Sequence, residues 1–173
     1  MRFQSQRLLL MPLSQDHWPV FLALHSDDSV MQYVADMQSE AHVKVRFEQR
    51  LGEHSHHTHK FCWAITCKQT AAVFGVIGYD LVNDSQAELG YMLLPHHQGR
   101  GYASEALERV IAFAVKAQGV RCFSATVTQG NEASRKVLIN CGFSQLQTRN
   151  TGYMINGKEV NDWCFELCVN AQL

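Results

Sequence analysis

The chain has 173 residues, of which 46% are hydrophobic and 18% are charged. This composition excludes a disordered chain, and the length predicts a single domain covering residues 1–173. Lys and Arg total 15 against 16 for Asp and Glu, so the net charge is −1. Such a balance argues against a strongly basic nucleic-acid binder or a polybasic membrane binder, although it leaves room for a local basic site.

No apolar run in the sequence approaches the roughly 20 residues that a membrane-spanning helix needs. The apolar stretch Leu8–Leu10 follows Arg2 and Arg7, but it is too short for the hydrophobic region of a secretion signal. We therefore expect a cytoplasmic protein with no membrane partner, present as a monomer or a homodimer.

The six cysteines occupy positions 62, 67, 122, 141, 164 and 168, and none forms a Cys-x-x-Cys pair. Because a domain of this size needs no disulfide, we expect reduced thiols. The histidine-rich segment His54–His59 has no cysteine partners at zinc spacing and is typical of a polar loop. We therefore expect no metal site.

The first third of the chain predicts one short apolar strand, Arg7–Leu13, followed by three helices. Apolar residues recur at helical spacing in each helical segment, and capping residues such as Ser14 and Ser39 precede two of them. Gly52 is a stop signal for the third. We expect these helices at about 18–24, 27–35 and 40–51.

The rest of the chain predicts strands with two helices between them. Segments rich in β-branched and aromatic residues predict the strands, and the glycines Gly119 and Gly142 mark the ends of the helices. Asn156-Gly157 predicts a hairpin turn. We expect helices at 103–118 and 131–141, and strands at 61–67, 73–82, 88–94, 120–128, 143–155 and 160–169.

Strand 88–94, helix 103–118 and strand 120–128 form a β-α-β unit, which makes these two strands parallel. Short connections join most of the other strands and favour antiparallel pairing. The predicted fold class is therefore α/β, with a mixed and mostly antiparallel sheet of about seven strands and helices on both faces.

The segment Pro95–Ser104 leaves a strand and opens a helix, and it carries Gly99 and Gly101. Glycines let the backbone turn sharply and approach a ligand closely. The first N–H groups of a helix have no partners inside the helix, and the helix dipole favours an anion there. Arg100 adds a positive charge, so this loop predicts a pyrophosphate site.

Three known phosphate-binding patterns are candidates for this loop. A P-loop ends in Gly-Lys-Ser or Gly-Lys-Thr, which is absent. A dinucleotide fingerprint needs a third glycine and a later acidic residue, whereas Ser104 follows Gly101 here. The third pattern, Gln-x-x-Gly-x-Ala, is present at Gln98–Ala103. The loop by itself leaves a nicotinamide-type nucleotide and a simple strand-to-helix turn as alternatives.

The segment Gln98–Ala103 resembles the diagnostic [RQ]-x-x-G-x-[GA] loop of the GNAT N-acetyltransferases. Ala87–Pro95 is similar to that family's pantetheine-binding strand, and Asn131–Phe143 is similar to its Asn-x-x-Ser segment with a later Gly-Phe. Arg7–Leu10 and Ile155–Gly157 resemble the branch of bacterial ribosomal-protein N-terminal acetyltransferases. The three central segments, in this order, are specific for the superfamily.

This resemblance implies that the two parallel strands splay apart and that acetyl-CoA enters between them. Backbone groups of Met92 and Leu93 would then pair with the pantetheine arm, which Asn131 would also bind. The residues implied at the pyrophosphate are Gln98, Gly99, Arg100, Gly101, Tyr102, Ala103 and Ser104.

The resemblance also implies direct attack of a neutral amine on the thioester. Glu88, at the start of the strand that lines the cleft, is the candidate base, and Ser134 is the candidate donor to the departing thiolate. The favoured acceptor is the N-terminal α-amine of a ribosomal protein, with a small amine such as a polyamine or aminoglycoside as the alternative. A non-catalytic acyl-CoA sensor is the alternative of another class. Gly152–Met154 lacks an acidic residue that the ribosomal branch often has there, which affects the choice of base.

Overall fold

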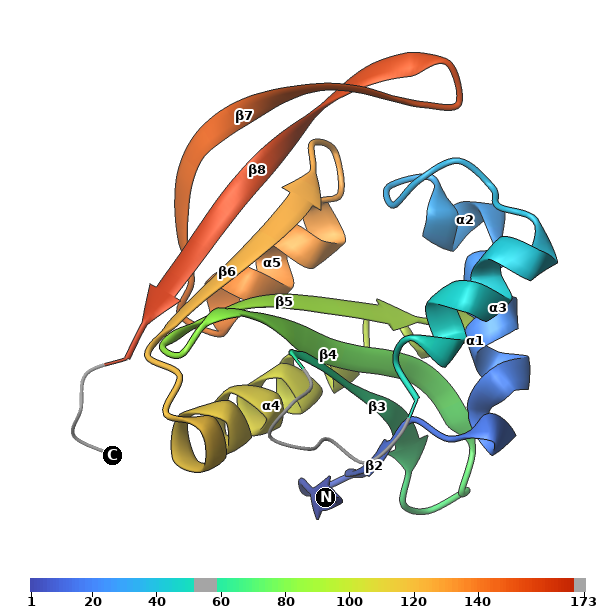
Figure 1. Cartoon of the computed structure of the whole chain (residues 1–173), viewed down its shortest axis with the longest axis vertical. Coiled ribbons are helices and arrows are strands. Elements are labelled where there is room, and N and C mark those ends of the chain that lie inside the picture. Colours follow the sequence, from blue (N-terminus) through green and yellow to red (C-terminus); the bar gives the residue numbers. More distant parts are fainter. Residues whose placement is uncertain (52–58, 170–173) are drawn as a thin grey trace.

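The computed structural model describes residues 1–51 and 59–169 (Figure 1). Eight strands of this described part form one sheet in the order β1-β2-β3-β4-β5-β6-β8-β7. The strands are β1 (Phe3–Gln4), β2 (Leu8–Pro12), β3 (Lys60–Cys67), β4 (Val73–Asn83), β5 (Gln86–Leu93), β6 (Cys122–Thr128), β7 (Ser144–Ile155) and β8 (Lys158–Cys168). The helices are α1 (Trp18–His25), α2 (Asp28–Met31), α3 (Glu40–Glu48), α4 (Tyr102–Gln118) and α5 (Glu132–Asn140).

The predicted α/β class and mixed sheet are confirmed, because β5 and β6 pair in parallel while the other neighbouring strands pair antiparallel. The sheet is open rather than closed into a barrel. It has one strand more than expected, since β1 is only two residues long and shows no alternation in the sequence. The helix expected over 27–35 is confined to α2, which Asp27 caps by accepting from the N–H groups of Ser29 and Val30.

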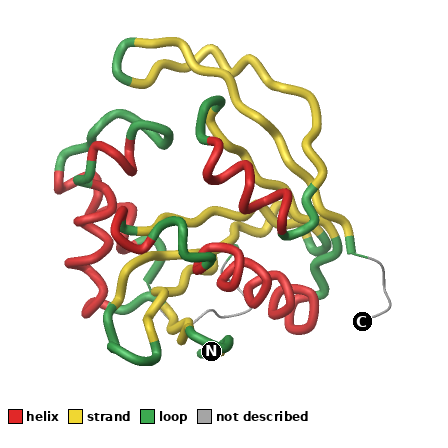
Figure 2. Tube along the Cα trace, turned by 180° about the vertical axis from the view of Figure 1, so that it is seen from behind, coloured by secondary structure: helices red, strands yellow, loops and turns green. Residues whose placement is uncertain are grey.

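Helices cover the two faces of the sheet in separate groups. On one face, α4 contributes Leu107 and Val110 to a core that includes Phe123 of β6. On the other face, Phe21 of α1 and Phe47 of α3 form a second core with residues of β3 and β4. Figure 2, the view from behind, shows these two groups of helices well separated from each other. Strands of the sheet that no helix covers are visible between the two groups.

Two glycines in the left-handed conformation bound α4. Gly101 precedes the helix with φ +77°, and Gly119 ends it with φ +71° while donating its N–H to the carbonyl of Ala114. This conformation is costly for residues that carry a Cβ, so the glycines set the length of the helix. Between them, residues at helical spacing form the buried face: Ala103, Ala106, Leu107, Val110 and Ala114.

The parallel pairing of β5 and β6 stops part-way along both strands. Three pairs are formed, Gln86 with Cys122, Ala87 with Phe123 and Glu88 with Ser124. Beyond them, β5 continues to Leu93 and β6 to Thr128 without pairing to each other. The two strands therefore splay apart from Glu88 onward, and they leave a gap inside the sheet.

The expectation of six reduced cysteines is wrong, because Cys122 of β6 and Cys168 of β8 form a disulfide. The two residues lie directly opposite each other in the antiparallel β6–β8 pair, with 4.1 Å between their Cα atoms. This pairing depends on the register of strands that are distant in sequence, which no spacing rule reveals. The other four, Cys62, Cys67, Cys141 and Cys164, are free.

Candidate active site

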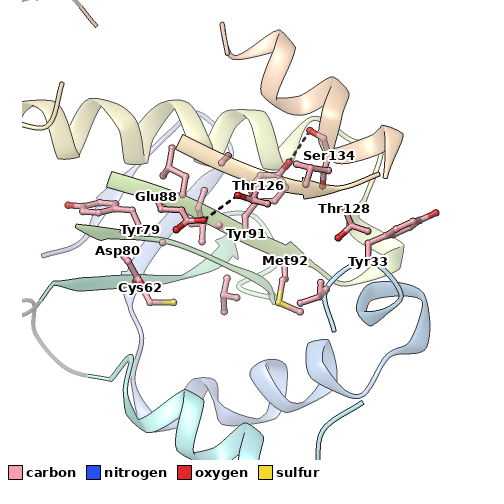
Figure 3. Close-up of a pocket in the computed structure, with 18 of the residues that line it drawn as sticks. Tyr33, Cys62, Tyr79, Asp80, Glu88, Tyr91, Met92, Thr126, Thr128 and Ser134 are labelled. Carbon is pink, nitrogen blue, oxygen red and sulfur yellow. Dashed lines mark hydrogen bonds between the residues drawn. The ribbon is translucent and has the colours of Figure 1, made fainter. Parts of the chain in front are cut away.

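A cavity of about 490 Å³ begins at the gap between β5 and β6 and extends across the sheet toward α1 and α3 (Figure 3). On the gap side it is lined by β5, β6 and α5, including Glu88, Thr126 and Ser134. On the far side it is lined by residues of α1 and α3 and of the turns that follow α2 and α3. The cavity thus connects the splayed strands with the helices of the opposite group.

The loop before α4 has the geometry of an anion site. Gly99 and Gly101 both have positive φ, at +70° and +77°. The Gln98 side chain donates from Nε2 to the carbonyl of Leu93 over 2.9 Å, which fastens the loop to the end of β5. The N–H groups of the first turn of α4 follow directly, and no carbonyl of the same helix can reach them. The residues present therefore fit a pyrophosphate.

Arg7, at the entry to β2, holds this loop in place. Its Nη1 donates to the carbonyl of Arg100 over 3.0 Å, and its Nε forms an ion pair with Glu105 of α4 over 2.7 Å. The guanidinium also stacks on the ring of Tyr102, 4.5 Å from the ring centroid. This role of Arg7 was not predicted, because the residue is far from the loop in sequence and no local signal connects them.

Glu105 is the partner that keeps Arg7 in position. Burial acts to raise the pKa of this carboxyl, but hydrogen bonds from Ser5 and from Arg7 outweigh it, so the pKa lies below its usual value. The Ser5 hydroxyl donates over 2.6 Å and the Arg7 backbone N–H over 2.7 Å. The N-terminal segment is thus attached to the first turn of α4 by three donors to one carboxylate.

The other residues expected at the pyrophosphate differ in what their side chains do. Arg100 is exposed, so its charge is free to face an anion. Tyr102 packs against Phe74, with 5.0 Å between the ring centroids, and Ala103 is in the core. Ser104 accepts a hydrogen bond from Cys141 at its carbonyl oxygen. Tyr102, Ala103 and Ser104 are therefore placed to offer their backbone N–H groups to a ligand.

Of the two backbone contacts expected on β5, Leu93 faces the gap and Met92 does not. The N–H of Leu94 donates to the carbonyl of Phe74 in β4. Backbone polar groups alternate in direction along a strand. The N–H and C=O groups of Met92 therefore point toward β4, and those of Tyr91 and Leu93 point toward β6. The side chain of Met92 lines the cavity instead.

The two candidate catalytic residues line one cavity from opposite sides of the gap. The side chain of Glu88 is exposed and lies on the same face of the sheet as α1 and α3. It accepts a long hydrogen bond of 3.4 Å from Thr126 (Figure 3). Ser134 lies on the α5 side, where its carbonyl accepts from the Tyr91 hydroxyl over 3.3 Å. Asn131 caps α5 by accepting from the N–H of Ser134 over 3.1 Å.

A third polar group in the cavity was not predicted. The Tyr153 hydroxyl donates to Asp162 over 3.0 Å and lies 3.2 Å from the hydroxyl of Thr128. Burial, followed by the nearby carboxylate, raises the pKa of Tyr153. Asp162 is 3% exposed and belongs to β8, so this carboxylate approaches the aromatic residue of β7 from the neighbouring strand. Gly152–Met154, which carries no acidic residue, contains no signal of it.

The far side of the cavity, which we call the α1–α3 wall, is formed by His25 of α1, Tyr33 after α2, and Arg46 and Arg50 of α3 and its following turn. The ring of Tyr33 lies beside Gly130 in the turn between β6 and α5. Asp36 accepts a 2.6 Å hydrogen bond from the backbone N–H of Asn156, at the tip of the β7–β8 hairpin. The segment that follows α2 therefore contacts the tip of this hairpin.

Gly52 and, within the histidine-rich segment, His54–His57 lie outside the described residues. Across residues 1–51 and 59–169, no three His, Cys, Asp or Glu side chains are grouped to hold a metal ion. No helix in this part of the chain is long and apolar enough to cross a membrane.

Comparison with known families agrees with this geometry. Residues 7–144 match the acetyltransferase (GNAT) domain. The chain belongs to the GNAT acetyltransferase family. It is an acetyl-CoA-dependent N-acetyltransferase, as the Gln98–Ala103 loop and the splayed strands predicted. Among curated relatives of this GNAT enzyme, the uncharacterized N-acetyltransferase YoaA of Bacillus subtilis is 26% identical over 82% of each chain.

Solved structures share the whole fold at low sequence identity. A RimL ribosomal L7/L12 α-N-protein acetyltransferase with bound coenzyme A has a TM-score of 0.83 at 18% identity, covering 99% of this GNAT chain and 100% of that one. The spermidine N-acetyltransferase of Vibrio cholerae, in complex with CoA and spermine, has a TM-score of 0.82 at 17% identity over 95% and 96%. Proteins of this fold therefore include enzymes named for protein and for polyamine acceptors.

Proposed function

We propose that this GNAT enzyme acetylates the α-amine at the N-terminus of a protein, with a ribosomal protein as the first candidate, in the cytoplasm. The observation that supports this proposal is the exposed carboxylate of Glu88 at the point where β5 and β6 part, in a cavity that opens toward the α1–α3 wall. An α-amine has an ordinary pKa near 8 and a lysine near 10.4. A modest base or a water relay is therefore enough for an α-amine.

Acetyl-CoA supplies the acetyl group: a bond forms between the amine nitrogen and the carbonyl carbon, the carbon–sulfur bond breaks, and coenzyme A leaves as the thiolate. Glu88 takes the proton that the amine loses, directly or through water. The backbone N–H groups of Tyr91 and Leu93 point into the gap, where they donate to the developing oxyanion or to the pantetheine arm. Ser134, across the gap, donates its hydroxyl proton to the thiolate and regains a proton from solvent, while Glu88 releases the proton of the amine to solvent.

Thiol release from acetyl-CoA tests this proposal. One panel contains short peptides with the free N-termini of ribosomal proteins, and the other contains polyamines and aminoglycosides. We expect release with one or more peptides and none when the same N-terminus is blocked. Release with small amines alone would contradict a protein acceptor while leaving the acetyltransferase activity in place.

A further inference from the structure

The α1–α3 wall contains two cationic side chains that have no anionic partner among the described residues. Arg46 and Arg50 are one helical turn apart, are partly buried and both line the cavity. The described residues hold three ion pairs, and neither arginine takes part in any of them. The Arg50 Nη1 donates instead to the backbone carbonyl of Arg46, over 3.2 Å. Within this part of the chain, two guanidinium groups therefore face the cavity without a carboxylate.

The surroundings of the two guanidinium groups make their charged state energetically unfavourable in the absence of a bound anion. Burial, and then the charge of Arg50, lowers the pKa of Arg46. His25 is 4% exposed, and its Nδ1 lies 2.8 Å from the carbonyl of Phe21. His25 lines the same cavity as the two arginines. Its pKa is lowered mainly by burial and further by the charges of the two arginines. A bound anion would relieve this repulsion.

The end of the cavity nearer the β5–β6 gap has the opposite charge. Asp80 is opposite Glu88 in the β4–β5 pair, but Asp80 is neutralised by Lys60 over 3.0 Å. Glu88 has no ion pair with any residue in the described ranges, and its hydrogen bond to Thr126 is long. Among the described residues, the cavity thus contains two carboxylates without an ion pair, Glu88 at the gap and the buried Asp162, which accepts a hydrogen bond from Tyr153. The two guanidinium groups without an ion pair in this part of the chain are at the wall.

Both of these ends belong to one cavity. On its floor, Cys62, Gly78 and Gly90 lie side by side on β3, β4 and β5. The floor is open at Gly90, where an added Cβ would meet no atom within 4 Å. Because Glu88 and the two arginines line the same cavity, one ligand can contact both ends.

We propose that Arg46 and Arg50 form an anion subsite, and that the acceptor carries a carboxylate close to its reactive amine. This inference rests on the proposed function and narrows it to N-termini with Asp or Glu within their first few residues. The amine is at Glu88 while the acidic side chain pairs with the guanidinium groups. A polyamine is disfavoured, because its second ammonium group would lie beside two like charges.

Matched peptides that differ at one side chain test the subsite. In short peptides with Glu, Gln or Lys at positions two to four, we expect kcat/KM for the Glu peptide to exceed that for the Gln peptide by about tenfold or more, and the Lys peptide to be poorest. Equal kcat/KM for the Glu and Gln peptides at all three positions would overturn the inference.

Arg46→Gln is the sharpest variant, because the hydrogen bond from Arg50 uses only the backbone carbonyl of Arg46 and survives the change. We expect this variant to lose most of the preference for Glu over Gln, while KM for acetyl-CoA stays the same. Arg46→Lys keeps the charge and should restore part of the preference. Arg109→Gln, at an exposed position of α4, is the control and should retain it fully. A full preference in Arg46→Gln would contradict the subsite.

Different results would contradict the proposed anion subsite and the proposed peptide acceptor. If small amines alone are acetylated, the peptide proposal is wrong, and the subsite is then tested with an amino acid and its amide. A preference for the amino acid that disappears in Arg46→Gln upholds the subsite. Equal rates with the amino acid and the amide overturn it.

Discussion

The loop before α4, which we propose holds the cofactor, and the α1–α3 wall, which we propose faces the acceptor, are built in different ways, and we call them the cofactor side and the acceptor side. Around the loop before α4, Arg7 and Gln98 connect β2, β5 and α4 through hydrogen bonds and an ion pair. Beside the α1–α3 wall, the segment that follows α2 contacts the β7–β8 hairpin through the hydrogen bond from Asn156 to Asp36, between two exposed residues. The rigid side is suited to one constant ligand, and the lightly connected side to an acceptor that varies among enzymes of this fold.

Glu88→Gln, at the boundary between the two sides, is expected to have the largest effect. We expect kcat to fall by about 100-fold or more, which is the usual cost of losing a positioned base, with KM for acetyl-CoA nearly unchanged. Steady-state kinetics with a peptide acceptor measures this. The control is Glu166→Gln, since Glu166 is an exposed carboxylate paired with Ser124 in the same row of the sheet. An equal loss in both variants would remove the catalytic assignment.

Gly101→Val tests the cofactor side through the backbone. A β-branched residue in the left-handed conformation is strained, and its side chain would also contact the guanidinium of Arg7. We expect KM for acetyl-CoA to rise by about tenfold or more, as each 1.4 kcal/mol corresponds to a factor of ten.

Gly119→Val is the matched control at the other end of α4, where φ is +71° and a Cβ would meet no atom within 4 Å. It should cost about 1–2 kcal/mol of folding free energy and leave KM for acetyl-CoA unchanged. If both variants raise this KM equally, the loop before α4 has no special part in binding the cofactor.

Arg7→Gln removes the ion pair of Arg7 and leaves the sequence of the loop before α4 unchanged. We expect KM for acetyl-CoA to rise by roughly threefold to tenfold, because a charge-assisted tie to the loop is lost. Since the pKa of Glu105 is lowered in the folded chain, the tie stabilises the fold above the ordinary pKa of a glutamate, and this stability is lost as pH falls through the lowered value. Wild type should therefore have a higher melting temperature than the variant at pH 7, and this difference should shrink below about pH 4. A difference in melting temperature that does not depend on pH would exclude the ion pair as its source.

Asp36→Ala tests the acceptor side, and it should have the smallest effect. One exposed hydrogen bond contributes about 1 kcal/mol or less, so we expect the melting temperature to change by only a few degrees. KM for the acceptor should change about twofold to threefold, with KM for acetyl-CoA constant. An effect on the acetyl-CoA KM as large as that of Arg7→Gln would show that the two sides are not separate.

The backbone features of the cofactor side could be predicted from the sequence because their signals are local. The turn at Gly99 and Gly101 and the helix end at Gly119 each depend on a few adjacent residues. The β-α-β order then predicts that β5 and β6 are parallel. The resemblance to the GNAT family implies that these two strands splay apart. These features all lie within one continuous stretch of the chain.

The acceptor side and the ties across the fold could not be predicted in the same way. Arg7 meets Arg100 and Glu105, and Asp162 meets Tyr153, only after distant strands have paired. Arg46 and Arg50 are ordinary charged residues in the sequence, and only the structure shows that they line the cavity without an ion pair among the described residues.

The splay of β5 and β6 has a consequence for the protein before it meets its cofactor. Each strand there presents an edge in the middle of the sheet, with backbone groups that the neighbouring strand does not pair and that water or a foreign strand can reach. Amide protons of Tyr91 and Leu93 should therefore exchange with solvent quickly in the free enzyme and slowly once the pantetheine arm covers them. Slow exchange in the complex would mean that the cofactor completes a sheet that the polypeptide leaves unfinished and that it blocks self-association of the chain at this edge.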